Sequence, residues 1–316
     1  MHLLSRLSRL GCALATLSAI AFAEEPEPRT RQPASVDDQD AVSLRGLFDF
    51  QLPKLIRPES VRFTLNPLFG DVIHRDQIRF RTGLRYAFTK HFEVSAEVVP
   101  FIDNFGGNGA NGFGVAEYRF GTKIGWRTLL DPIVDTAFGA TVAMPAPGAP
   151  EQLTIGTTRF TPYVVFSRDI PAVRGLGAFL NLAYECFDSD PDRDRIPRYR
   201  PARDNVIITP GVVLHRAPWH YTLATALRTT ALDGEHREYF SVLPSVSYEV
   251  PERWLPFISG RVVVGAGYEA IFFGGEYEQR ITSRVRWDFD WVRAARNLGS
   301  DVLETMPWRN GRSGKH

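Results

Sequence analysis

Three glycines in the stretch FIDNFGGNGANGFGVAEYRF, residues 101–120, have the spacing of a dinucleotide-binding loop. Gly107, Gly109 and Gly112 spell G-x-G-x-x-G, and Asp131 follows at roughly the distance of a ribose-binding acid. Such a loop holds a pyrophosphate only where it opens a helix, because the helix N-terminus supplies the donors. The residues after Gly112 alternate with a period of two, which predicts a strand. We therefore interpret GGNGANG as a reversal between two strands, where Gly and Asn accept positive φ.

A run of aspartates is the second candidate for chemistry, because oxygen ligands at alternate positions are typical of a calcium loop. In this sequence Arg193 stands where the turn glycine belongs, and Tyr199 stands where a bidentate Glu belongs. A solvated loop fits better than a metal site, so metal binding is only a weak alternative here. The aspartates concerned are Asp188, Asp190, Asp192 and Asp194.

A hydrolase would need a nucleophile, a base and an orienting group within reach of one another. His220 and Thr222 are the nearest such pair, and no Ser follows a His at a useful strand spacing. We therefore predict that the chain is not an enzyme, and no motif calls for a cofactor.

The overall charge offers no case for a polyanionic partner. The chain has 316 residues, 44% of them hydrophobic, and a formal net charge of +1. It has no long basic run of the kind that nucleic-acid binders carry, so we predict no nucleic-acid partner.

The N-terminus has the layout of a secretory signal peptide. Two arginines precede a short apolar run, and the small residues Ala21 and Ala23 precede Glu24. We expect residues 1–23 to be removed. Cleavage would remove Cys12 and leave Cys186 alone, so no intramolecular disulfide is expected.

Residues 24–59 are predicted to form a periplasmic segment that precedes the fold. Its first part is charged and rich in proline, a composition that predicts disorder. The more apolar part, SLRGLFDFQLPKLIRP, could be a short strand, a periplasmic anchor or a plug inserted in a cavity. These three alternatives stay open at this point.

Beyond residue 60 the sequence alternates between apolar and polar residues, the pattern of strands with one face of each kind. Most alternating segments are ten to fourteen residues long, whereas soluble strands usually have ~5–6 residues and tilted membrane strands need ~9–11. We count twelve segments, an even number as bacterial single-chain barrels require. They are residues 60–66, 76–88, 91–103, 114–127, 133–145, 157–168, 175–187, 204–215, 219–229, 237–249, 260–272 and 277–289.

The connections between these segments are mostly long at one end and short at the other, as in outer-membrane barrels with extracellular loops and periplasmic turns. Tryptophans gather at the predicted periplasmic end, as an interfacial aromatic girdle requires. These are Trp126, Trp219, Trp254, Trp287 and Trp291.

The chain thus resembles the bacterial outer-membrane β-barrel class, porin-like in architecture, over residues 60–291. The resemblance implies an all-β fold, a transmembrane antiparallel up-and-down barrel of about twelve strands, in the outer membrane of a Gram-negative-type bacterium. Its implied partners are outer-membrane lipid and lipopolysaccharide, and the barrel-assembly machinery. Residues 292–316 follow the last strand as a predicted periplasmic tail, a departure from barrels that end on a terminal-strand aromatic.

The inward face predicted by the alternation is charged. Glu93 and Glu97 are expected inside, and a hairpin centred on Thr89 would set Arg85 opposite Glu93 and Arg81 opposite Glu97. The first, second and last strands would together present one basic wall, made of Arg62, Arg79, Arg81, Arg85, Arg280, Arg284 and Arg286.

Two functions fit this inward face about equally well. A water-filled passage would let small solutes through and would favour anions. Alternatively, inward aromatic residues could pack the lumen shut and leave a structural barrel, or one that binds or adheres through its loops. A hydrolase is the less favoured third class.

Overall fold

The computed structural model describes residues 53, 55–56, 58, 60–69, 77–103, 112–130, 134–149, 157–188, 204–230, 238–255, 260–273 and 276–289. Within them the chain forms twelve strands and one short 3-10 helix, η4 (Glu252–Trp254). The strands are β1 (Val61–Phe69), β2 (Gln77–Ala87), β3 (Phe92–Asp103), β4 (Phe113–Leu130), β5 (Val134–Pro145), β6 (Arg159–Asp169), β7 (Leu176–Phe187), β8 (Asn205–Arg216), β9 (Trp219–Thr229), β10 (Glu238–Val250), β11 (Arg261–Phe273) and β12 (Glu276–Phe289).

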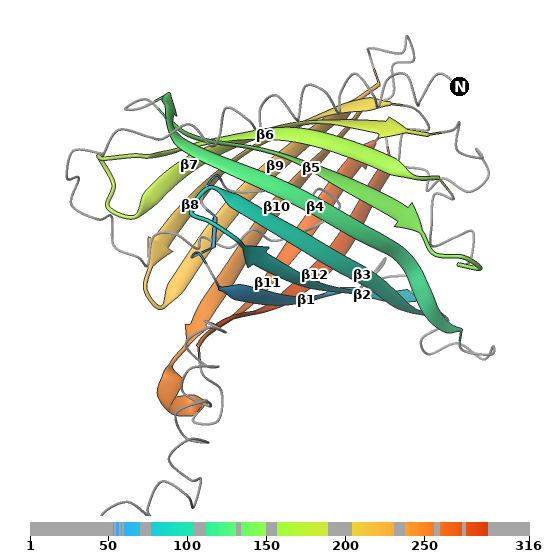
Figure 1. The fold of residues 1–316 in the computed structure, drawn as a ribbon, viewed down its shortest axis with the longest axis horizontal. Helices are drawn as coiled ribbons and strands as arrows, with labels where there is room; N and C mark the ends of the chain where they lie inside the picture. Colours follow the sequence, from blue (N-terminus) through green and yellow to red (C-terminus); the bar gives the residue numbers. More distant parts are fainter. Residues whose placement is uncertain are drawn as a thin grey trace, which may run out of the picture.

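The strands form one closed antiparallel barrel in which each strand pairs with its neighbours in the chain (Figure 1). β1 closes the barrel by pairing with β12, with Val61 opposite Phe289 and Phe69 opposite Ile281. Closure leaves no sheet edge, so the ladder satisfies the backbone groups that lipid could not. The prediction of twelve strands in an up-and-down barrel is confirmed, and each expected segment corresponds to one strand.

Apolar side chains face outward and polar ones face the lumen, as β9 illustrates. Along that strand His220 is 1% and Thr222 5% exposed, whereas Tyr221 is 47% and Leu223 46% exposed. A soluble barrel would bury its apolar face instead. The outer surface is therefore suited to hydrocarbon.

The β2–β3 hairpin has a different register from the one predicted. Arg85 lies opposite Ser95, Glu93 lies opposite Ala87, and Glu97 lies opposite Gly83. The amide of Phe88 donates to the carbonyl of Phe92 at 3.0 Å, so the turn centres one residue beyond Thr89. A shift of one residue at the turn moves every cross-strand partner by two, so the predicted register was wrong although the faces were right, and Arg85 reaches Glu93 diagonally at 3.6 Å.

The two ends of the barrel differ in their connections. One end, the short-turn end, carries the links β2–β3, β4–β5, β6–β7, β8–β9 and β10–β11, and the β8–β9 link is only Ala217–Pro218. The other end, the long-loop end, carries the remaining links, of which β7–β8 is the longest. No helix in the part of the chain that the structure describes is long and apolar enough to cross a membrane.

Three of the five tryptophans predicted for the girdle have described side chains. Trp219 begins β9, Trp254 ends η4 and Trp287 lies near the end of β12, all at the short-turn end. The Tyr248 ring contacts two of them at a tilt, with ring centroids 4.7 Å from Trp219 and 6.2 Å from Trp254. The backbone of Trp126 pairs with Thr136 toward the same end, and Trp291 lies outside the described residues.

Several other predictions also fall outside the described residues. They concern residues 1–23, most of residues 24–59, residues 292–316, the glycines before Gly112, and Asp190, Asp192 and Asp194. Gly112 is followed directly by β4, so the glycine motif leads into a strand and not into a helix.

Candidate functional site

The predicted basic wall lies on the lumen face of three adjacent strands. β12, β1 and β2 are neighbours in the barrel, and Arg62 on β1 lies directly opposite Arg85 on β2. Arg286 on β12 lies opposite Thr64, which itself lies opposite Gly83. The structure therefore brings the seven predicted arginines to one continuous surface, here called the arginine wall: Arg62, Arg79, Arg81, Arg85, Arg280, Arg284 and Arg286.

Two acidic side chains on β12, which were not predicted as site residues, form ion pairs with arginines of the arginine wall. Asp288 accepts two hydrogen bonds from Arg62, at 2.6 and 3.1 Å, and lies 3.2 Å from Arg286. Glu278 accepts a 2.8 Å hydrogen bond from Arg280. Their signal was present in the sequence, because they share the period-two face of β12 with the arginines.

Glu93 lies on β3, the strand next to the arginine wall, and contacts two cations. One of its oxygens, Oε1, lies 3.6 Å from Arg85 and 3.5 Å from Lys123 on β4. The carboxylate is 3% exposed, so these cations offset the cost of burying its charge. Glu97 is also buried on the lumen face, 8% exposed.

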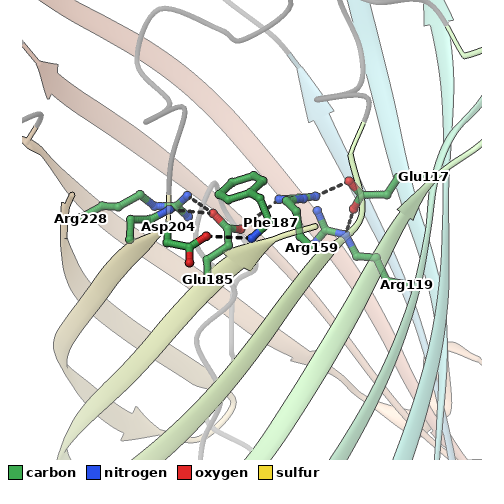
Figure 2. Close-up of polar contacts among 8 residues, drawn as sticks. Glu117, Arg119, Arg159, Glu185, Phe187, Asp204 and Arg228 are labelled. Carbon is green, nitrogen blue, oxygen red and sulfur yellow. Dashed lines mark hydrogen bonds and ion pairs between the residues drawn. The ribbon is translucent and has the colours of Figure 1, made fainter. Parts of the chain in front are cut away.

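A second cluster of lumen charges, the Glu185 network, was not predicted (Figure 2). Arg159 on β6 contacts Glu117 on β4 and donates a 3.1 Å hydrogen bond to Glu185 on β7. Glu185 also accepts hydrogen bonds from Arg228 at 2.6 Å and from Asn205 at 3.2 Å. Arg119 contacts Glu117 as well, and the Arg228 guanidinium lies 5.4 Å from the centre of the Tyr239 ring.

The Glu185 network lies near the long-loop end, because Arg159 and Asn205 begin their strands there. Its members are buried, with Arg228 2%, Arg159 4% and Glu185 4% exposed. It links β4 to β6 and β7 to β9, strands that are not adjacent, so the side chains bridge the concave inner surface of the barrel.

Apolar side chains fill part of the lumen on β7 to β11. One cluster joins Phe179, Val213, Ala224, Leu243 and Val263, and a second joins Ile207, Ala226, Tyr239 and Ile271. Phe179 and Tyr239 are inward aromatic residues, the kind expected to fill a packed lumen. The lumen face of β12 to β4 is thus charged, whereas that of β7 to β11 combines these apolar clusters with part of the Glu185 network.

The other candidates for chemistry are placed as follows. His220 faces the lumen, and its Nδ1 lies 2.6 Å from Nδ1 of His215, so its ring contact is with a second histidine. The pairing of His220 with Thr222 that was considered for a hydrolase gains no support from this geometry. Asp188 ends up exposed after β7, and the described residues hold no group of three or more His, Cys, Asp or Glu side chains that could bind a metal.

Comparisons with known proteins agree on the architecture. No protein-family model matches the chain, and no curated protein sequence matches it. Among solved structures, the COG4313 outer membrane channel from Pseudomonas putida F1 superposes with a TM-score of 0.50 at 10% identity, over 77% of this chain and 100% of that one. This likeness shows the fold alone.

Two further likenesses are weaker. The KdgM porin has a TM-score of 0.44 at 9% identity, over 73% of this chain and 99% of that one. The outer membrane phospholipase of Salmonella typhi has a TM-score of 0.42 at 10% identity, over 78% of this chain and 95% of that one. The closed barrel, apolar outside and charged inside, has the architecture of the outer-membrane β-barrel class.

Proposed function

We propose that this barrel is a passive channel for small solutes and that its lumen favours anions. The observation that carries the proposal is the arginine wall. On β12, β1 and β2 the lumen-facing arginines outnumber the lumen-facing acids with described side chains, Asp288 and Glu278. Such a surplus of one sign inside low-dielectric walls raises the local concentration of the opposite ion.

The lumen charges support a passage for a second reason. Charged side chains facing inward are costly in a barrel unless they meet water or one another. Pairing holds the wall in place, and because arginines outnumber acids with described side chains on these three strands, this side of the lumen carries a net positive charge. Rings of basic side chains are a general device for anion pores.

The experiment is reversal-potential measurement on the purified full chain in a planar bilayer under a KCl gradient. We expect single-channel steps and a reversal potential of the sign that marks chloride as the more permeant ion. A cation-selective current would contradict the anion preference. A barrel that stays silent in folded, correctly inserted form would contradict the channel itself.

A closed structural or loop-binding barrel is the second candidate, and the two apolar clusters on β7 to β11 favour it. Phe179, Leu243 and Ile271 occupy lumen space that solute would otherwise use. The same bilayer measurement separates the two candidates, because a packed lumen passes no current.

A further inference from the structure

A short stretch that precedes β1 lies against the inner surface of the barrel at the short-turn end. Pro53, Leu55 and Ile56 are buried, with Leu55 9% and Ile56 6% exposed. None of the three belongs to a strand. Their burial therefore comes from packing against the lumen face and not from a place in the sheet.

A hydrogen bond to Glu93 holds the stretch in place. The Ile56 amide donates a 3.1 Å hydrogen bond to Oε2 of Glu93. Oε1 of the same carboxylate faces Arg85 and Lys123. One oxygen thus contacts the cations, and the other accepts the hydrogen bond from Ile56. The contacts with Arg85 and Lys123 orient the carboxylate that accepts the Ile56 hydrogen bond.

The stretch also packs against β4 at Gly125, and this contact is here called the seat. A Cβ built on Gly125 would stand 2.1 Å from Cδ1 of Leu55 and 3.3 Å from the carbonyl oxygen of Pro53. Only glycine leaves room for such a close approach. His91 fixes this part of β4, since the Gly125 amide donates to its carbonyl at 2.9 Å.

These two contacts place the stretch away from the strand it leads into. Gly125 is on β4, and β2 and β3 separate β4 from β1, where the chain enters the sheet at Val61. Three strand spacings of about 4.8 Å lie between them. Leu55 thus lies across β2 and β3 from Val61, where β1 begins.

We propose that Pro53, Leu55 and Ile56 are part of a plug that narrows the short-turn mouth of the lumen, held by the Glu93 carboxylate and packed on Gly125. The inference rests on the proposed channel function and assigns its regulation. Among the described residues of the stretch, the fastening consists of the Ile56 amide hydrogen bond and the packing of Pro53, Leu55 and Ile56, none of which is in a strand. A plug held this way can leave while the barrel stays intact.

An engineered disulfide tests two things separately: the contact of Leu55 with Gly125, and the gate, meaning the narrowing of the lumen by the plug. Leu55→Cys removes the atom that would clash with a new side chain at 125, so it is combined with Gly125→Cys in a Cys186→Ser background. The matched control pairs Leu55→Cys with Ala226→Cys, a lumen-facing position on β9. Peptide mass spectrometry after oxidation reports the cross-link, and bilayer recording before and after reductant reports the conductance.

We expect a cross-link between positions 55 and 125 and none between positions 55 and 226. When reductant breaks the 55–125 disulfide, the conductance should rise several-fold. Glu93→Gln should raise the conductance of the uncross-linked channel as well. Failure of the 55–125 cross-link, or equal cross-linking at 226, would overturn the seat. Cross-linking without any change of current on reduction would overturn the gate and leave the channel standing. Silence in every variant, with the cross-link formed, would overturn the channel and the gate together while the seat stands.

Discussion

Glu185 on β7 and Arg228 on β9 form a 2.6 Å ion pair that spans the intervening strand β8. Both side chains are almost completely buried, and Arg159 approaches the same carboxylate from β6 at 3.1 Å. One carboxylate thus ties three strands together on the inside of the barrel. Its removal would leave two buried guanidinium groups without that anion, and the following predictions begin there.

Glu185→Ala should destabilise the barrel strongly. Breaking a buried pair by removing one partner costs about 3–5 kcal/mol, because the remaining charge stays desolvated. The matched control is Glu249→Ala, which removes the partner of Arg261 at 2.7 Å in a pair whose side chains are 19% and 31% exposed. That loss should be smaller than the loss at Glu185, because both side chains of the Arg261–Glu249 pair are partly exposed to water. Denaturant unfolding in micelles measures the unfolding free energy of both variants. Equal losses of free energy would show that the Glu185 network contributes no more to stability than the Arg261–Glu249 pair.

Arg79→Gln combined with Arg280→Gln should weaken the anion preference of the channel. Both side chains face the lumen on the arginine wall and are only partly buried, so their removal lowers the local potential with little damage to packing. The reversal potential under a salt gradient should move toward zero. Arg168→Gln is the control, because Arg168 is exposed on the outer face of β6 and should leave the reversal potential unchanged. A shift in the control alone would contradict the assignment.

Leu223→Arg should prevent or weaken assembly in lipid. Leu223 is 46% exposed on the outer face in the middle of β9. An arginine at the bilayer midplane costs about 2–4 kcal/mol on a barrel surface, and near the interface only about 0–1. Leu130→Arg, at the short-turn end of β4 and 41% exposed, is therefore the depth control. Folding yield and unfolding free energy in lipid vesicles should fall for the first variant and hold for the second.

Gly211→Ala should disturb the apolar cluster around Phe179. A Cβ at Gly211 would stand 2.3 Å from Cζ of Phe179 and 3.0 Å from the carbonyl oxygen of Leu223. Overpacking of this kind typically costs about 1–3 kcal/mol. At Gly177 the nearest atom would be an Asp169 oxygen at 3.5 Å, so Gly177→Ala should be close to neutral. If unfolding in micelles gave the two variants the same stability, the ring of Phe179 would not pack against Gly211.

Local pattern was enough to predict much of this fold. Period-two alternation located all twelve strands, because each strand has one apolar face outside and one polar face inside whatever its partners are. Chain order then set the neighbours, since an up-and-down barrel pairs consecutive strands and closes the last on the first. The arginine wall follows from these two facts alone.

Register was harder to predict than strand position. The β2–β3 hairpin was assigned a centre at Thr89, and the structure moved its centre by one residue. Alternation cannot detect this shift, because moving partners by two residues leaves every side chain on the same face. The turn's own hydrogen bonds decide it.

The amino-acid sequence by itself determined the strand count, the polarity of the two faces and the place of the arginine wall on the inner one. Only the tertiary structure decided which lumen residues meet. Glu185 reaches Arg228 over β8, and Ile56 reaches Glu93, because the curvature of the closed sheet brings inward side chains of non-adjacent elements together. That curvature belongs to the whole barrel, so no single segment of the sequence encodes these contacts.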